Sequence, residues 1–204
     1  MKIFCIGRNY EAHARELENP LPEELIVFMK PDTALLRNNV PFYIPDFSNE
    51  VHYETEIIVR INRLGKGIEE KYAHRYYEEI GLGIDFTARD LQNQLRAKGL
   101  PWEKSKAFDN SAVISEFINI SQFANNIKNL PFHLEINGEI RQKGNSSDMI
   151  FSVDKIISEL SKYFTLKIGD IIFTGTPAGV GAIAIGDRLI GYIEDKCFFD
   201  FLVK

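Results

Sequence analysis

Residues 52–61 read His52-Tyr53-Glu54-Thr55-Glu56-Ile57-Ile58-Val59-Arg60-Ile61. The residues at positions 57, 58, 59 and 61 are β-branched, which is typical of a strand. Side chains alternate between the two faces of a strand, so Glu54 and Glu56 would lie on one face if the strand begins with them. Residues 56–61 therefore predict a strand, and if residues 52–56 open it, the strand presents two neighbouring carboxylates on one face.

Strands are predicted along most of the remaining chain. Residues 132–136 alternate between apolar and polar side chains and run into Asn137-Gly138, which predicts a hairpin with a two-residue turn. Further strands are predicted at residues 3–6, 26–29, 80–86, 171–174, 188–193 and 197–203.

Helices are fewer. One is predicted at residues 10–17, and a second runs to Lys98, opened by a capping box at residues 87–90 and stopped by Gly99. A third spans residues 153–164, with Ser152 as its N-cap. Because strands and helices do not alternate as regular βαβ units, the sequence predicts an α+β fold with a β-rich core.

Composition excludes several classes of protein. The 204 residues predict one domain, spanning residues 1–204. A formal net charge of −5 argues against a nucleic-acid partner, which needs a basic stripe. No apolar run approaches the roughly 20 residues that span a membrane. Cys5 and Cys197 lie in apolar runs and are expected to be buried reduced thiols, which favours a cytoplasmic protein.

The two neighbouring glutamates have a chemical interpretation. Adjacent carboxylates repel each other unless a cation lies between them. Oxygen ligands suit a hard cation such as Mg²⁺ or Mn²⁺ better than zinc, and Asp85, at the end of another predicted strand, could be a third ligand. From spacing alone, the more frequent explanation of Glu54 and Glu56 is the solvent-facing side of an amphipathic strand.

His13 and Glu16 are three residues apart in a predicted helix and are therefore neighbours on its surface. A carboxylate beside an imidazole orients the ring and raises its basicity, which is the arrangement needed to activate water. A solvated His–Glu pair without function is the alternative, and it is the more frequent one for such a pair.

Residues 174–181 form a glycine-rich stretch, Thr174-Gly175-Thr176-Pro177-Ala178-Gly179-Val180-Gly181. Such a loop can turn backbone amides and a hydroxyl towards an anion. It is not a P-loop, because no lysine follows the last glycine. A tight turn between two strands is an equally good interpretation.

Eight motifs together resemble the fumarylacetoacetate hydrolase family in its short single-domain form, from about residue 4 to residue 187. Each motif is weak alone, but their common order is specific. One departure is that residues 110–114 lack the proline that many relatives carry there. The motifs are Gly7-Arg8-Asn9-Tyr10 with His13 and Glu16; Phe28 to Pro31; His52 to Glu56; Asp85 to Gln92; Lys98 to Trp102 with Lys106 to Asp109; Asn137-Gly138 with Gln142; Asp148 to Phe151; and Thr174 to Gly181 with Gly186-Asp187.

The resemblance implies a fold and a set of site residues. The fold is a β-rich sandwich roll with a few flanking helices, of the type of the family's C-terminal domain. A divalent metal, usually Mg²⁺ with Mn²⁺ or Ca²⁺ as alternatives, is held by Glu54, Glu56 and Asp85. The resemblance also implies a catalytic set and a substrate-binding set. The catalytic residues are His13, Glu16 and Lys106, and the substrate-binding residues are Arg8, Lys30, Arg89, Gln92 and Thr176.

The implied function is that of a metal-dependent hydrolase. It would cleave a C–C bond in acylpyruvate-like 2,4-dioxo acids, such as acetylpyruvate or fumarylpyruvate, through a pyruvate enolate. The same enolate chemistry would also suit an oxaloacetate decarboxylase or keto–enol tautomerase, or an isomerase of 2-hydroxyhepta-2,4-diene-1,7-dioate-like compounds. A non-catalytic metal or metabolite binder is a further alternative, although it would need no water-activating base. The expected partners are a small anionic 2-oxo acid and a second copy of the chain in a homodimer.

Overall fold

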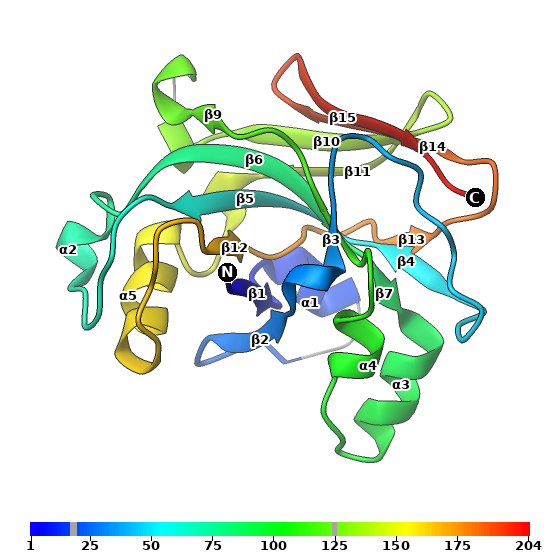
Figure 1. The fold of residues 1–204 in the computed structure, drawn as a ribbon, viewed down its shortest axis with the longest axis horizontal. Helices are drawn as coiled ribbons and strands as arrows, with labels where there is room; N and C mark the ends of the chain where they lie inside the picture. The colour runs from blue at the N-terminus through cyan, green and yellow to red at the C-terminus, as the bar shows by residue number, and fades with distance from the viewer. Residues whose placement is uncertain (17–19, 124–125) are drawn as a thin grey trace.

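The computed structural model describes residues 1–16, 20–123 and 126–204. Its centre consists of β-sheets, and the long strands of the largest sheet curve across the middle of the molecule (Figure 1). That sheet has the order β2 (Ile26–Lys30), β1 (Ile3–Gly7), β12 (Ile171–Phe173), β5 (Thr55–Ile61), β6 (Tyr77–Asp85), β8 (Ala112–Ile114) and β3 (Leu35–Leu36), with β9 (Ile118–Asn119) also paired to β6.

Two smaller sheets complete the strands. The second sheet is an antiparallel one of four strands, and the third joins three short strands near the ends of β5 and β6. The second has the order β11 (Glu139–Asn145), β10 (Pro131–Ile136), β14 (Arg188–Ile193) and β15 (Lys196–Leu202), and the third has the order β13 (Gly181–Ala182), β4 (Val51–Tyr53) and β7 (Thr87–Ala88).

The helices are short and lie around the strands, so the α+β class with a β-rich core is confirmed (Figure 1). In the described part of the chain, no helix has the length and apolar character that a membrane crossing requires. The α-helices are α1 (Glu11–Glu16), α2 (Glu70–Ala73), α3 (Arg89–Ala97), α4 (Glu103–Lys106) and α5 (Val153–Tyr163), and the 3₁₀ helices are Asp32–Ala34, Ile120–Gln122, Asn126–Lys128 and Ser146–Asp148.

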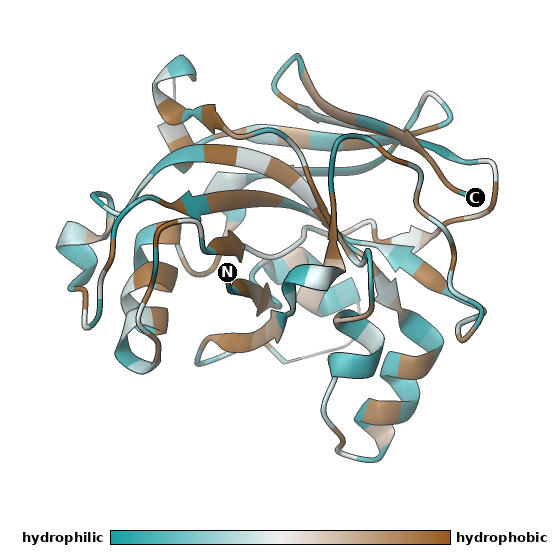
Figure 2. Cartoon of the chain, in the orientation of Figure 1, coloured by the Kyte–Doolittle hydropathy of each residue, from teal (hydrophilic) through white to brown (hydrophobic). Residues whose placement is uncertain are grey.

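The hydrophobic core lies on both faces of β5. Ile57, Val59 and Ile61 point into a large cluster shared with the second sheet and α5, whereas Ile58 points into a smaller cluster on the opposite face. Figure 2 shows the apolar residues concentrated on the central strands. Burying one such side chain contributes about 1.5–3 kcal/mol, so the alternation of β5 is strongly determined.

This alternation sets the position of the carboxylates. Glu56 shares its face of β5 with Ile58, away from the core between the sheets. Gly83 of β6 lies opposite Glu56 in the strand register, and the amide of Asp85 donates to the carbonyl oxygen of Glu54 at 2.8 Å. Adjacent strands therefore bring Glu54, Glu56 and Asp85 to one end and one face of the sheet.

Several local predictions are confirmed. Asn137 and Gly138 have φ values of 55° and 82° and join β10 to β11 as a two-residue turn. The Ser152 hydroxyl accepts a hydrogen bond from the Lys155 amide at 3.2 Å and caps α5. The first predicted helix is present as α1, although its last predicted residue, Leu17, lies outside the described residues.

The capping box predicted at Thr87 is wrong. The N-cap of α3 is Ala88, which makes no side-chain cap, and Thr87 belongs to β7. The Thr87 hydroxyl instead donates to Glu54 Oε1 at 3.2 Å. A buried carboxylate thus uses the hydroxyl that local spacing assigned to the helix.

The expectation of two buried cysteines is correct for Cys5 and wrong for Cys197, which is exposed. Cys197 lies near the start of β15, the edge strand of the second sheet, next to an irregularity in the register with β14. There the normal alternation is interrupted, and Phe198 and Phe199 are both buried.

Candidate metal centre and active site

Three buried carboxylates form the centre of the site. Glu54 precedes β5, Glu56 lies within it, and Asp85 ends β6. One oxygen from each carboxylate lies within 4.8 Å of the other two, and the residues are only 6%, 2% and 1% exposed. The predicted common face of Glu54 and Glu56 is confirmed, and their interpretation as a solvent-facing pair is wrong.

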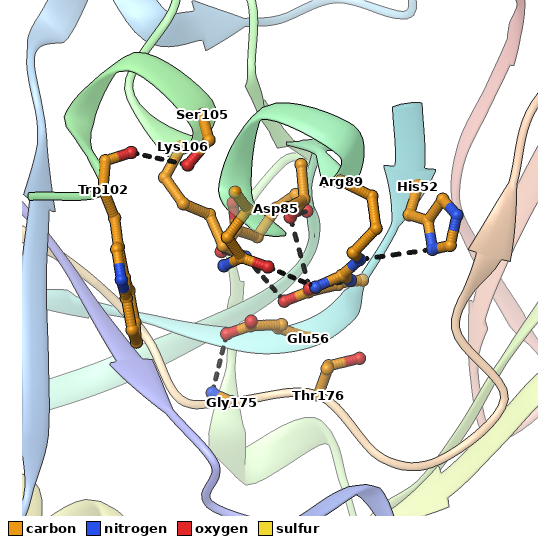
Figure 3. A network of polar contacts seen from close by, with 12 residues as sticks. His52, Glu56, Asp85, Arg89, Trp102, Ser105, Lys106, Gly175 and Thr176 are labelled. Atoms are coloured by element: carbon orange, nitrogen blue, oxygen red, sulfur yellow. Dashed lines mark hydrogen bonds and ion pairs between the residues drawn. The ribbon is translucent and has the colours of Figure 1, made fainter. Parts of the chain in front are cut away.

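Three cationic side chains surround this triad, and Figure 3 shows two of them, Lys106 and Arg89. Lys106 Nζ donates to Glu54 Oε2 and Asp85 Oδ2, both at 2.8 Å. Lys30 Nζ lies 2.7 Å from Asp85 Oδ1, and Arg89 Nη2 donates to Glu54 Oε1 at 2.5 Å. The formal charges of the three carboxylates and three cations cancel, as a buried cluster requires.

The carboxylates are not neutralised equally. Burial raises the pKa of Glu54, but the charges of Lys106 and Arg89 outweigh it and hold that pKa well below its usual range. Burial followed by the charges of Asp85 and Glu54 raises the pKa of Glu56 well above its usual range. Within the described residues, Glu56 has no ion pair, and its Oε2 accepts a hydrogen bond from the Gly175 amide at 2.6 Å.

This donor set fits a hard divalent cation. It offers three carboxylate oxygens, and Asp85 Oδ1 has an ion pair but no hydrogen bond among the described atoms. A divalent cation next to Glu56 would supply the positive charge that this carboxylate lacks. The chemistry of the donors excludes a zinc site of the usual nitrogen and sulfur type.

Ser111, between α4 and β8, holds the two lysines in place. Ser111 Oγ accepts a hydrogen bond from Lys30 Nζ at 3.0 Å and donates one to the Lys106 carbonyl oxygen at 2.9 Å. Lys30 also donates to that carbonyl oxygen. These bonds connect β2, α4 and the start of β8, so residues distant in sequence meet at the carboxylates.

The His13–Glu16 pair is also formed. His13 is buried, and its Nδ1 lies 3.2 Å from Glu16 Oε2. The Gly179 amide donates to both Glu16 oxygens, at 3.0 and 3.2 Å. The carboxylate that orients the imidazole is therefore itself anchored, which a free surface pair would not be.

The glycine-rich loop uses its amides on the protein's own carboxylates. The Gly175 amide binds Glu56 and the Gly179 amide binds Glu16. The loop thus joins the metal centre to the His–Glu pair. The sequence allowed two interpretations of this loop, a tight turn or a site for an external anion. Neither describes these two amides, because both bind carboxylates of the protein itself.

The residues assigned to the site by sequence converge on one cleft, with a few placed just behind it. Trp102 and Phe28 add apolar side chains to its wall. Lys30 and Glu16 contact the lining residues Asp85 and His13 from outside the cleft or from its edge. Glu56 also lies outside the lining, with a carboxylate oxygen within 4.8 Å of those of Glu54 and Asp85. The assigned residues that line the cleft are Arg8, His13, Glu54, Asp85, Arg89, Gln92, Lys106 and Thr176.

Arg89, Gln92 and Thr176 have defined protein partners as well. Arg89 Nη1 donates to Gln92 Oε1 at 2.6 Å. The Thr176 hydroxyl donates to the Thr55 carbonyl oxygen at 2.9 Å and accepts from Gln142 Nε2 at 2.7 Å. Arg89 therefore supports Glu54, and Thr176 supports β5 through Thr55. All three residues also line the cleft.

Sequence reasoning left several supporting residues without a role. The buried Asn9 amide group donates to the carbonyl oxygens of Phe151 and Thr174, at 2.9 and 2.7 Å, and so fixes the start of the glycine-rich loop. Arg96 lines the cleft together with Arg89 and Gln92. The spacing of these three residues along one helix could have revealed Arg96, since i, i+3 and i+7 share a helix face.

Replacing Gly175 by Ala is expected to weaken metal binding and destabilise the protein. Gly175 has φ 102°, and an added Cβ would lie 2.6 Å from Asn9 Cβ, so the amide that binds Glu56 must shift. Gly186→Ala is the matched control, because Gly186 has φ 97° and open space around its Cβ position. Urea unfolding should show a loss in the free energy of unfolding that is about 1–3 kcal/mol larger for Gly175→Ala than for Gly186→Ala. Calorimetric titration with Mg²⁺ should show weaker metal binding for Gly175→Ala alone. Equal losses in the two variants would contradict this role of Gly175.

Comparison with known proteins identifies the family. The family model described as fumarylacetoacetate (FAA) hydrolase C-terminal matches residues 2–197. The chain belongs to the fumarylacetoacetate hydrolase family. The crystal structure of fumarylpyruvate hydrolase from Pseudomonas aeruginosa in complex with Mn²⁺ and pyruvate matches it with a TM-score of 0.93 and 36% sequence identity, covering 100% of this chain and 89% of that one.

Curated relatives in the fumarylacetoacetate hydrolase family are enzymes. Oxaloacetate tautomerase YcgM of Escherichia coli (strain K12) is 41% identical over 188 residues, which cover 92% of this chain and 86% of that protein. The mitochondrial oxaloacetate decarboxylase of Dictyostelium discoideum is 40% identical over 207 residues, with coverage of 100% and 94%. The family and the fold predicted from the motifs are thus confirmed. The names of the relatives cover several reactions: tautomerisation, decarboxylation and hydrolysis.

Proposed function

We propose that the protein interconverts the keto and enol forms of oxaloacetate or of a closely similar short 2-oxo dicarboxylate. The observation that carries this proposal is a single cleft lined by Glu54 and Asp85 of the metal-compatible triad, by Lys106 and by His13. Such a cleft can stabilise negative charge on one oxygen and move one proton, which is all that tautomerisation requires. The relatives named for oxaloacetate, at 41% and 40% identity, support the choice of substrate.

Glu54, Glu56 and Asp85 are proposed to hold Mg²⁺, with Mn²⁺ as a substitute. The carboxylate donor set supports a hard cation. The Mn²⁺ named in the Pseudomonas aeruginosa structure supports a divalent metal in this fold. When bound, such a cation supplies a Lewis acid for the negative charge on the 2-oxo oxygen.

Lys106 is proposed to bind a substrate oxygen. Burial lowers its pKa, but the charges of Asp85 and Glu54 outweigh burial, so the pKa is raised and the side chain stays an ammonium. An ammonium has three donors, and Glu54 and Asp85 take two of them. The third donor remains for the substrate.

His13 is proposed to move the proton at the carbon next to the 2-oxo group. His13 Nδ1 lies 3.2 Å from Glu16 Oε2, and in the tautomer that donates from Nδ1 to this carboxylate the other ring nitrogen, Nε2, can take that proton. A proton lost from carbon and gained by the oxygen completes conversion to the enol. The reverse transfers regenerate the keto form, so no other reactant is consumed.

Hydrolysis of acylpyruvates is the second candidate, and the anchored His13–Glu16 pair is the observation that favours it. A base held by a fixed carboxylate can activate water for attack on a distal carbonyl group, after which the C–C bond breaks. The family includes the fumarylpyruvate hydrolase named above, which supports this reaction on the same scaffold.

A substrate panel tests the proposal. Purified protein with Mg²⁺ should accelerate the conversion of enol-oxaloacetate to keto-oxaloacetate, and no carbon dioxide should be released. Metal-stripped protein should not accelerate this conversion. Acetylpyruvate and fumarylpyruvate in the same panel would yield pyruvate if the second candidate holds, and carbon dioxide from oxaloacetate would identify decarboxylation. No acceleration of ketonisation beyond the buffer rate would refute the tautomerase proposal.

The homodimer expected from the resemblance is proposed as the form in solution. Light scattering should then give a mass near twice the 23.4 kDa of one chain. A mass of one chain at micromolar concentration would contradict it.

A further inference from the structure

The guanidinium of Arg89 has a different protein partner for each of its three nitrogen atoms. Nη2 donates to Glu54 Oε1 at 2.5 Å, and Nη1 donates to Gln92 Oε1 at 2.6 Å. Nε donates to His52 Nδ1 at 3.4 Å, a contact that Figure 3 shows between the two side chains. A guanidinium has five N–H donors, so three are directed to the protein and two remain.

Strand pairing places His52 beside Arg89. His52 lies in β4, and its partner in the register of β7 is Thr87, two residues before Arg89 begins α3. The Arg89 amide donates to the Glu50 carbonyl oxygen at 2.7 Å, so the backbone next to this pair is held as well. The imidazole therefore reaches the Arg89 side chain from a neighbouring strand.

The contact with Arg89 determines the tautomer of His52. A guanidinium stays protonated and can only donate, so His52 Nδ1 has to accept and carries no proton. The proton of the neutral ring is then on Nε2, which lies 2.8 Å from Glu50 Oε1 and donates to that carboxylate. One tautomer thus satisfies both contacts, and Glu50 fixes the ring in the orientation that Arg89 requires.

We propose that His52, oriented by Glu50, is a positioning residue that fixes the Arg89 guanidinium so that its remaining donors meet an oxygen of the bound 2-oxo acid. The inference rests on the proposed function, in which the substrate binds beside the triad. Arg89 lines the cleft and is only 6% exposed, whereas His52 is not part of the lining and acts through Arg89. Without an acceptor at Nδ1, a buried N–H would lose its partner and the guanidinium would turn to find another.

Binding of an unreactive ligand tests this role independently of turnover. The probe is pyruvate, measured by calorimetry on Mg²⁺-saturated protein, and a separate Mg²⁺ titration verifies saturation of each variant. His52→Phe keeps a ring but removes the acceptor, so pyruvate should bind about tenfold more weakly. His52→Asn keeps an acceptor oxygen near the position of Nδ1, so its affinity should stay within about threefold of that of the unchanged protein.

His133→Phe is the matched control, and it should leave pyruvate binding unchanged. Like His52, His133 lies on a strand and pairs with a glutamate two residues away, Glu135, but it is outside the cleft lining. Glu50→Ala keeps the test decisive if His52→Phe does not fold, because Glu50 is exposed. It should weaken pyruvate binding about threefold by releasing the imidazole.

The outcomes separate this inference from the proposed reaction. Equal weakening in His52→Phe and His52→Asn, unchanged binding in His52→Phe or in Glu50→Ala, or no binding of pyruvate by the unchanged protein would overturn the inference. A protein whose variants bind pyruvate as expected but which does not ketonise oxaloacetate would overturn only the proposed reaction.

Discussion

Replacing Glu56 by Gln is expected to lower the affinity for Mg²⁺ by about 100-fold or more and to reduce ketonisation of oxaloacetate to the buffer rate. Gln keeps the size of the side chain and an oxygen that can accept from the Gly175 amide, which binds Glu56 at 2.6 Å. It removes the negative charge that a divalent cation needs. Isothermal titration of metal-stripped protein measures the loss directly.

The same substitution is expected to leave the free energy of unfolding unchanged or higher. Glu56 is 2% exposed, and burial together with the charges of Asp85 and Glu54 opposes its ionisation. A neutral amide removes that repulsion from the metal-stripped protein. Loss of metal binding without loss of stability distinguishes a ligand from a structural carboxylate.

Glu79→Gln provides the control for this experiment. Glu79 lies on β6 like Asp85, but it is partly exposed and pairs with Arg60 at the far end of the strand. Its replacement should leave metal affinity unchanged. If Glu56→Gln bound Mg²⁺ as tightly as the unchanged protein, the triad would not be the metal centre.

Replacing His13 by Asn is expected to lower the turnover number by about 10²–10⁴-fold while metal affinity stays within about twofold. His13 has no bond to the triad among the described residues, and its partner is Glu16. The base is therefore removed without disturbing the carboxylates. Rates with enol-oxaloacetate and acetylpyruvate, together with Mg²⁺ titration, measure both parts.

Glu16→Gln is the companion variant. Gln can still accept hydrogen bonds from His13 and from the Gly179 amide, but it cannot stabilise a protonated imidazole by charge. Its turnover should fall less than that of His13→Asn. An unchanged rate in His13→Asn would remove the pair from the mechanism, and equal losses with both substrates would show that both reactions use the same base.

Local sequence rules predicted the features that depend on near neighbours. Alternation in residues 52–61 placed Glu54 and Glu56 on one face, because each buried isoleucine would otherwise lose its apolar contacts. The Asn137-Gly138 turn and the Ser152 cap follow from backbone preferences within four residues. The order of the motifs was sufficient to indicate the family.

Local rules were wrong where a distant partner competed for the same group. Thr87 has the spacing of a helix cap, yet its hydroxyl binds the buried Glu54. Cys197 lies in an apolar run, yet an irregularity at the edge of the second sheet leaves it exposed. Losing a hydrogen bond to a buried, charged carboxylate costs more free energy than leaving a helix cap unmade, so the tertiary partner prevails.

The amino-acid sequence by itself determined the strand that follows Glu54, the common face of Glu54 and Glu56, the hairpin, the α5 cap and the motifs that indicate the family. Only the tertiary structure decided that Asp85 lies beside Glu54, that Lys30, Lys106 and Arg89 neutralise the triad, and that the glycine-rich loop holds Glu16 and Glu56. The physical reason is range. Propensities and alternation act between residues a few positions apart, whereas strand register and the burial of charge depend on which distant segments pack together.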